Sequence, residues 1–161
     1  MLRRYTHLRA IVLSAAAFAA CASLPWPDEP GVPVALSRAA NVQAADAFLA
    51  KLTAERRAAN RPVPVLAPRL DDVLRAAAED LQAGKLTAGE VKRGIERWGS
   101  AWLVDCAGGE NMKLPSALVE RPSAVVSFAA AHFRPRSLAS DQCAVLVVAL
   151  EGSEQVGQEK M

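Results

Sequence analysis

Three segments of the chain repeat apolar residues at three- and four-residue intervals, the spacing of one face of an α-helix. The first covers residues 41–59, and its apolar face holds Val42, Ala45, Phe48, Leu49 and Leu52. The second covers 70–84, and the third runs from 87 to 98. Thr87 and Glu90 have the spacing of a capping box, which predicts the start of the third helix.

Shorter apolar runs predict strands. Residues 101–104 lead into a glycine turn, and 143–150 read CAVLVVAL, a continuous apolar run typical of a strand covered on both faces. A short extended piece is expected at 63–66. Pro122 suits the first position of a helix and predicts a fourth helix over 122–131. The expected fold is α/β (α+β), a three-layer α-β-α sandwich of about four helices around a small sheet.

The beginning of the chain has the pattern of an export signal. Arg3, Arg4 and Arg9 precede a stretch, 10–20, that is apolar apart from Ser14. That stretch is shorter than the roughly 20 residues that a helix needs to cross a bilayer. We therefore predict a cleaved signal peptide over 1–20.

The signal ends in Phe-Ala-Ala-Cys, which resembles the lipobox of bacterial lipoproteins and makes Cys21 the lipidation site. Ordinary cleavage near Cys21 and an uncleaved anchor are the alternatives. Since Ala22 rather than Asp follows, the resemblance favours the outer membrane over the inner one. The expected location is the bacterial envelope, otherwise periplasmic or secreted, with the membrane contacted through the lipid anchor.

Cysteine usage and charge agree with export. Apart from Cys21, the chain holds Cys106 and Cys143, and in an oxidising compartment these predict a disulfide rather than two free thiols. Three of the 19 Lys and Arg residues precede Cys21, so the remainder carries 16 against 17 acidic residues, a net charge of −1. Nothing suggests the basic patch that a nucleic-acid partner would require.

The domain boundaries follow from composition. Residues 21–39 include four prolines without helical or strand periodicity, which predicts an extended, lipid-anchored tether. Residues 40–151 form the expected domain, and the polar residues 152–161 a flexible tail.

Three stretches resemble bacterial CAP domains, the sperm-coating-protein-like (SCP) superfamily. The opening FLAKLTAERRAANRPVPVLAPRLDDVLRAAAEDLQAG is similar to the family's two first helices and their proline-containing link. Gly109, Glu110 and Asn111 match its GEN motif, and the stretch from Ala131 to Arg134 is similar to its histidine-arginine segment. The resemblance implies a diverged bacterial lipoprotein member with a shallow cleft.

Family members hold a divalent metal with two histidines and two glutamates. Here Ala77 and Ala78 stand where the first histidine is expected, and His132 is the one histidine after the signal. The family's last strand also has no counterpart. We therefore expect neither a metal site nor a cofactor.

The expected ligand-binding cleft combines Glu110, Asn111, His132 and Glu96. Two of these residues have a structural alternative: the carboxylate of Glu110 would hold its glycine turn by accepting backbone N–H bonds, and His132 would end a helix. The first functional hypothesis is a non-enzymatic envelope module that binds a small ligand, a lipid or an envelope protein. The alternatives are a hydrolase of envelope polymers that uses Glu110 and Glu96 as a carboxylate pair, or a structural lipoprotein.

Overall fold

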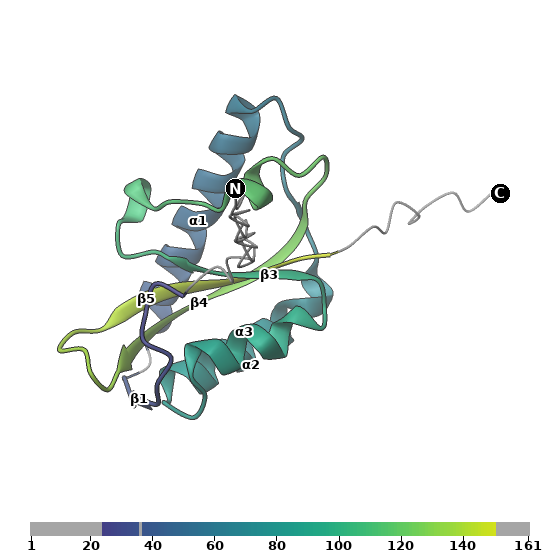
Figure 1. Cartoon of the computed structure of the whole chain (residues 1–161). Helices are drawn as coiled ribbons and strands as arrows, with labels where there is room; N and C mark the ends of the chain where they lie inside the picture. Colours follow the sequence, from purple (N-terminus) through teal and green to yellow (C-terminus); the bar gives the residue numbers. More distant parts are fainter. Residues whose placement is uncertain (1–23, 36, 151–161) are drawn as a thin grey trace, which may run out of the picture.

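The computed structural model describes residues 24–35 and 37–150, which form a mixed α+β fold of four α-helices and a curled, mostly antiparallel sheet of five strands (Figure 1). The helices are α1 (Arg38–Ala58), α2 (Asp71–Gln82), α3 (Ala88–Glu96) and α4 (Ser116–Val119). The strands are β1 (Gly31–Val32), β2 (Val65–Leu66), β3 (Ser100–Asp105), β4 (Val125–Pro135) and β5 (Gln142–Ala149). Two short 3-10 turns are η1 (Pro68–Leu70) and η2 (Gly109–Asn111).

Strand β5 lies at the centre of the sheet, between β3 and β4, and pairs antiparallel with both. Its residues alternate between two buried clusters, as the two-residue period of a strand requires. Leu146 and Val148 pack with residues of α2 and α3, whereas Val145 and Val147 pack with residues of α1 and α4. The prediction of a strand covered on both faces is therefore confirmed.

The predicted fourth helix is wrong, because residues 125–135 form the long strand β4. Alanines favour a helix, but this stretch also contains Val125, Val126 and Phe128, which fit a strand. Pairing along β5, from Val126 with Ala149 to Phe133 with Gln142, then decides the conformation. His132 accordingly lies within a strand and does not end a helix.

The three periodic helices are confirmed, and their ends follow capping chemistry. Helix α1 begins earlier than predicted because the Ser37 side chain accepts a hydrogen bond from the Ala40 N–H. Helix α3 has both halves of the expected capping box, in which Thr87 and Glu90 each accept a backbone N–H bond from the other.

The described part of the predicted tether does not behave as a free spacer. Trp26 is 5 % exposed and meets the ring of Phe133 edge-on at a centroid distance of 5.1 Å. Strand β1 pairs with the end of β4, Gly31 with Pro135 and Val32 with Arg134. The folded domain therefore includes residues that the sequence assigned to the tether.

Two glycines make this packing possible. Gly84 ends α2 with a φ of +73°, and a Cβ atom on it would lie 2.5 Å from the Gly31 carbonyl oxygen. Only a residue without a side chain allows the two backbones to approach in this way. The proline-rich segment packs without helical or strand periodicity, because its contacts come from isolated residues such as Trp26 and Gly31.

Asp28, in the same segment, caps a helix that is remote in sequence. Its carboxylate accepts the Gly89 N–H at 2.9 Å, in the first turn of α3. The Thr87 hydroxyl and this N–H hold the pKa of Asp28 below its ordinary value of 3.8. Because hydrogen bonds to the charged form favour it, the carboxylate stabilises the fold at neutral pH.

We expect Asp28→Ala to lower the free energy of unfolding by about 1 kcal/mol at pH 7, measured by urea denaturation. The contribution of Asp28 is fully present above its unfolded pKa and is lost as pH falls through the lower folded pKa. The difference between the two proteins should therefore shrink below pH 3.8. Glu110→Ala is the control, since that exposed carboxylate makes no hydrogen bond with any described residue. Equal losses in both variants would contradict the capping role.

Candidate binding site

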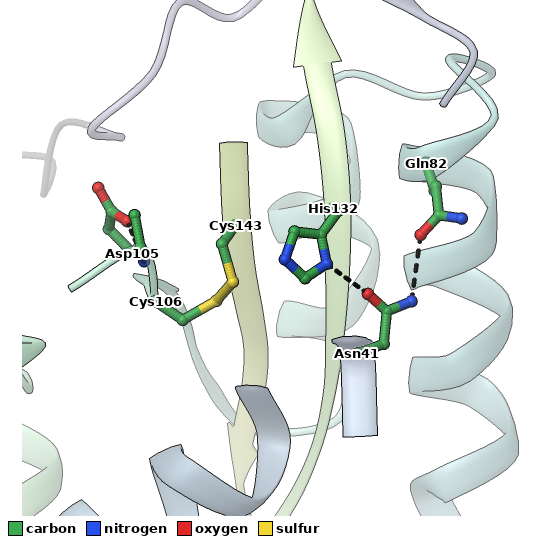
Figure 2. Close-up of a disulfide and its surroundings, with 7 residues drawn as sticks. Asn41, Gln82, Asp105, Cys106, His132 and Cys143 are labelled. Atoms are coloured by element: carbon green, nitrogen blue, oxygen red, sulfur yellow. Dashed lines mark hydrogen bonds between the residues drawn. A yellow bond between two sulfur atoms is a disulfide. The ribbon is translucent and has the colours of Figure 1, made fainter. Parts of the chain in front are cut away.

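Cys106 and Cys143 form the predicted disulfide, with a Cα–Cα distance of 5.1 Å (Figure 2). It joins the end of β3 to the start of β5, and the Cys106 N–H also donates to the Cys143 carbonyl. The turn η2, which holds Glu110 and Asn111, follows directly after Cys106 and lies against α1.

The glycine turn is held by a residue that the sequence analysis missed. The Asp105 carboxylate accepts the Ala107 N–H at 2.9 Å, which is an Asx-type turn. Glu110 and Asn111 are exposed, and the Glu110 side chain has no hydrogen bond to a described residue. The expectation that the Glu110 carboxylate holds the turn is therefore wrong.

His132 lies opposite Cys143 in the β4–β5 pair, so its ring and the disulfide share a face of the sheet (Figure 2). Its Nδ1 lies 2.7 Å from the Asn41 Oδ1, while the Asn41 amide donates to the Gln82 Oε1 at 3.1 Å. Since Oδ1 only accepts, the Nδ1 atom of His132 carries the proton. The chain of three polar residues links β4, α1 and the end of α2.

Glu96 is not part of this neighbourhood. It ends α3, whose apolar residues belong to the cluster opposite the one that contains Cys143, and it pairs with Lys92 at 3.5 Å. Glu110 lies in η2, next to α1 on the other face. The two carboxylates therefore do not face one site on the same side of the sheet. A hydrolytic pair requires both carboxylates at one substrate.

The described residues instead enclose a pocket between α1 and α2, over the outer edge of β4. Its volume is about 550 Å³, within the usual range for ligand sites. Apolar lining comes from both helices and from β2 and β4: Val42, Ala45, Leu66, Ala78, Val126, Phe128, Ala129 and Ala130. Alanines at 129 and 130 leave space that larger side chains would fill.

Polar groups surround this apolar lining, namely Arg38, Asn41, Asp71, Arg75, Glu79, Gln82 and Ser127. Asp71 accepts the Ser127 hydroxyl at 2.7 Å, and Arg75 pairs with Asp72 at 3.3 Å. Arg38 and Glu79 make no ion pair with any described residue. An apolar pocket with a few polar groups is the usual form of a binding site.

Of the predicted site residues, His132 alone touches this region, through Asn41. The sequence carried one usable signal for the pocket. Asn41 and Gln82 are polar residues on the inward sides of amphipathic helices, and buried polar groups need partners. Their mutual bond depends on the packing of α1 against α2, which periodicity alone does not reveal.

No protein family, curated protein or solved structure matches this chain. Within residues 24–35 and 37–150, no helix has the length and apolar character that crossing a bilayer requires. The same residues contain no group of three or more His, Cys, Asp or Glu side chains placed to hold a metal ion. The predicted signal peptide over 1–20, the predicted lipidation site Cys21 and the predicted tail over 152–161 lie outside the described residues.

Proposed function

We propose that this protein is a non-enzymatic binding module of the bacterial envelope, and that the pocket between α1 and α2 is its ligand site. The pocket itself carries the proposal, because it combines an apolar lining with polar groups from both helices and from β4. Val42 is 59 % exposed at this pocket, and Leu66 is also exposed there. Apolar side chains left open beside a cavity favour an occupant with apolar parts.

The compartment belongs to the same proposal. The arginine-led apolar beginning and the Cys21 motif favour export and a lipid anchor, which would place the domain at the outer membrane or in the periplasm. The Cys106–Cys143 disulfide is consistent with an oxidising compartment.

Kinship with the CAP superfamily is also proposed, on the sequence segments described above. Helices on both faces of the sheet are compatible with the three-layer α-β-α arrangement that the resemblance implies. A ligand cleft at Glu110, Asn111 and His132 has less support than the α1–α2 pocket, because the first two residues are exposed and His132 is engaged by Asn41.

The uncharged apolar dye N-phenyl-1-naphthylamine tests the site. We expect it to bind the folded chain saturably with increased fluorescence. Val42→Glu should raise its Kd at least about tenfold, because an apolar dye bound beside position 42 would take water away from the new carboxylate. Val63→Glu is the matched control, since Val63 is 46 % exposed and does not line the pocket.

Saturable binding that both substitutions weaken equally would place the dye elsewhere and count against the proposal. Absence of saturable dye binding would remove the support that the pocket gives to the proposed function. Circular dichroism of each variant shows whether its fold is retained.

A further inference from the structure

The edge of β4 is only partly paired. Strand β2 pairs with Val125 and Val126 at its start, and β1 pairs with Arg134 and Pro135 at its end. Residues 127–133 lie between them and have no strand on the side away from β5. The sheet therefore has a gap along this edge.

The hydrogen bonds identify the backbone groups that face the gap. The Val126 carbonyl accepts from the Ala67 N–H, on the side away from β5. Backbone groups alternate in direction along a strand, so Phe128, Ala130 and His132 direct their N–H and C=O groups the same way. No described residue donates to or accepts from these six groups.

The pocket lies over the first part of this gap. Side chains from both faces of β4 line it, Phe128 and Ala130 on one face and Ser127 and Ala129 on the other, so the cavity encloses the strand edge itself. The Asn41–Gln82 bond connects α1 to α2 near His132 and closes that end (Figure 2). Among the residues that line the pocket, Phe128 and Ala130 are those whose unpaired backbone groups face the gap.

Charged side chains of both signs line the pocket. Helix α1 contributes Arg38, and α2 contributes Asp71, Arg75 and Glu79, of which Arg75 pairs with Asp72. Successive side chains of an extended peptide in the gap would point to α1 and to α2 in turn. Neighbouring acidic and basic residues on such a peptide would then complement Arg38 and Glu79.

We propose that the pocket binds a short extended peptide of a partner protein, which adds a strand to β4 through the backbone of Phe128 and Ala130. Apolar side chains of the peptide fill the space beside Val42 and Ala78, and an adjacent acid–base pair meets Arg38 and Glu79. This inference rests on the proposed function and specifies its ligand. Backbone pairing supplies affinity in such complexes, and the alternating side chains supply specificity.

Amide hydrogen exchange, followed by NMR on the full chain, tests the open edge first. We expect the amides of Phe128 and Ala130 to exchange at least about a hundredfold faster than those of Ala129 and Ala131, which face β5. Equal protection at all four positions would overturn the proposal.

The ligand is then tested with a displayed library of random heptapeptides, selected on the immobilised chain. Selected peptides should contain alternating apolar residues and a neighbouring acid–base pair, and should protect the Phe128 and Ala130 amides. N-methylation of their backbone should weaken binding about tenfold at alternate positions and little at the others. Arg38→Glu and Glu79→Lys should each weaken binding, whereas Val63→Glu should not.

Failure to select any peptide, or indifference of binding to N-methylation at every position, would overturn the peptide proposal. Binding of the apolar dye in the same pocket would in that case leave the proposed function intact. Loss of both dye binding and peptide binding would contradict the proposed function as well as the peptide proposal.

Discussion

Replacement of both Cys106 and Cys143 by alanine should lower the free energy of unfolding by about 4 kcal/mol, the largest loss expected from any change in the disulfide region. The bond closes a loop with a sequence separation of 37, so it restricts the unfolded chain considerably. Both sulfur atoms also lie in the buried cluster between the sheet and α1. Urea denaturation of the oxidised wild type and the double variant measures the difference.

Reduced wild-type protein is the matched control for lost packing, because its side chains are unchanged apart from the bond. We expect it to be destabilised nearly as much as the double variant. A loss under about 1 kcal/mol in both would show that the disulfide adds little to this fold. The Asp105 contact with the Ala107 N–H should persist in either case, because it lies within the turn.

Arg56→Ala should be the most damaging single substitution, with an expected loss of about 4 kcal/mol. Arg56 is 0 % exposed, yet no described carboxylate pairs with it. Its guanidinium donates instead to the carbonyl oxygens of Pro62, Leu118, Val119 and Arg121, at 2.8 to 3.1 Å. Truncation would leave these oxygens without donors inside the protein.

Burial, and then the nearby Arg61 and Arg121, lower the pKa of Arg56. The carbonyl oxygens at the end of α4 accept hydrogen bonds from the Arg56 guanidinium and so compensate for its burial. Basic side chains commonly interact favourably with helix C-termini in this way. Arg57→Ala is the control, since the neighbouring arginine is exposed and should change stability by less than about 0.5 kcal/mol.

Arg56→Lys separates charge from shape. Lysine keeps the positive charge but lacks the planar fork that reaches several carbonyl oxygens at once, so it should recover only part of the loss. Full recovery by lysine would contradict the role assigned to the guanidinium geometry. Thermal denaturation of the three variants under one buffer gives the ranking.

Periodicity predicted the elements whose conformation is decided locally. The helices α1, α2 and α3 follow from apolar spacing, and β5 from its run of valines. Helices α2 and α3 and strand β5 bury their apolar residues, whereas α1 buries Phe48 and Leu52 and leaves Val42 exposed. Strand β4 could not be predicted in the same way. Its alanines are compatible with a helix, and only the ladder with β5 makes the extended form favourable.

The candidate site was predictable only in part. The cysteine count and the expected oxidising compartment predicted the Cys106–Cys143 pair, which the structure confirms. Glu110 and Glu96 were expected in one cleft, but the structure places their elements on opposite faces of the sheet. The α1–α2 pocket arises from tertiary packing and from an incomplete sheet edge. Apart from the polar residues Asn41 and Gln82, these features have no signature along the chain, because they depend on how helices and strands that are distant in sequence meet.

The close packing of Trp26 and β1 affects where the domain would stand relative to a membrane. Leu24 already contacts the buried cluster under α2 and α3, and only three peptide links separate it from Cys21. Three extended residues reach about 10 Å. Acylation of Cys21 would therefore hold the folded body almost against the lipid headgroups, with little freedom to move away from them, so any ligand of the domain would have to reach it at the bilayer surface.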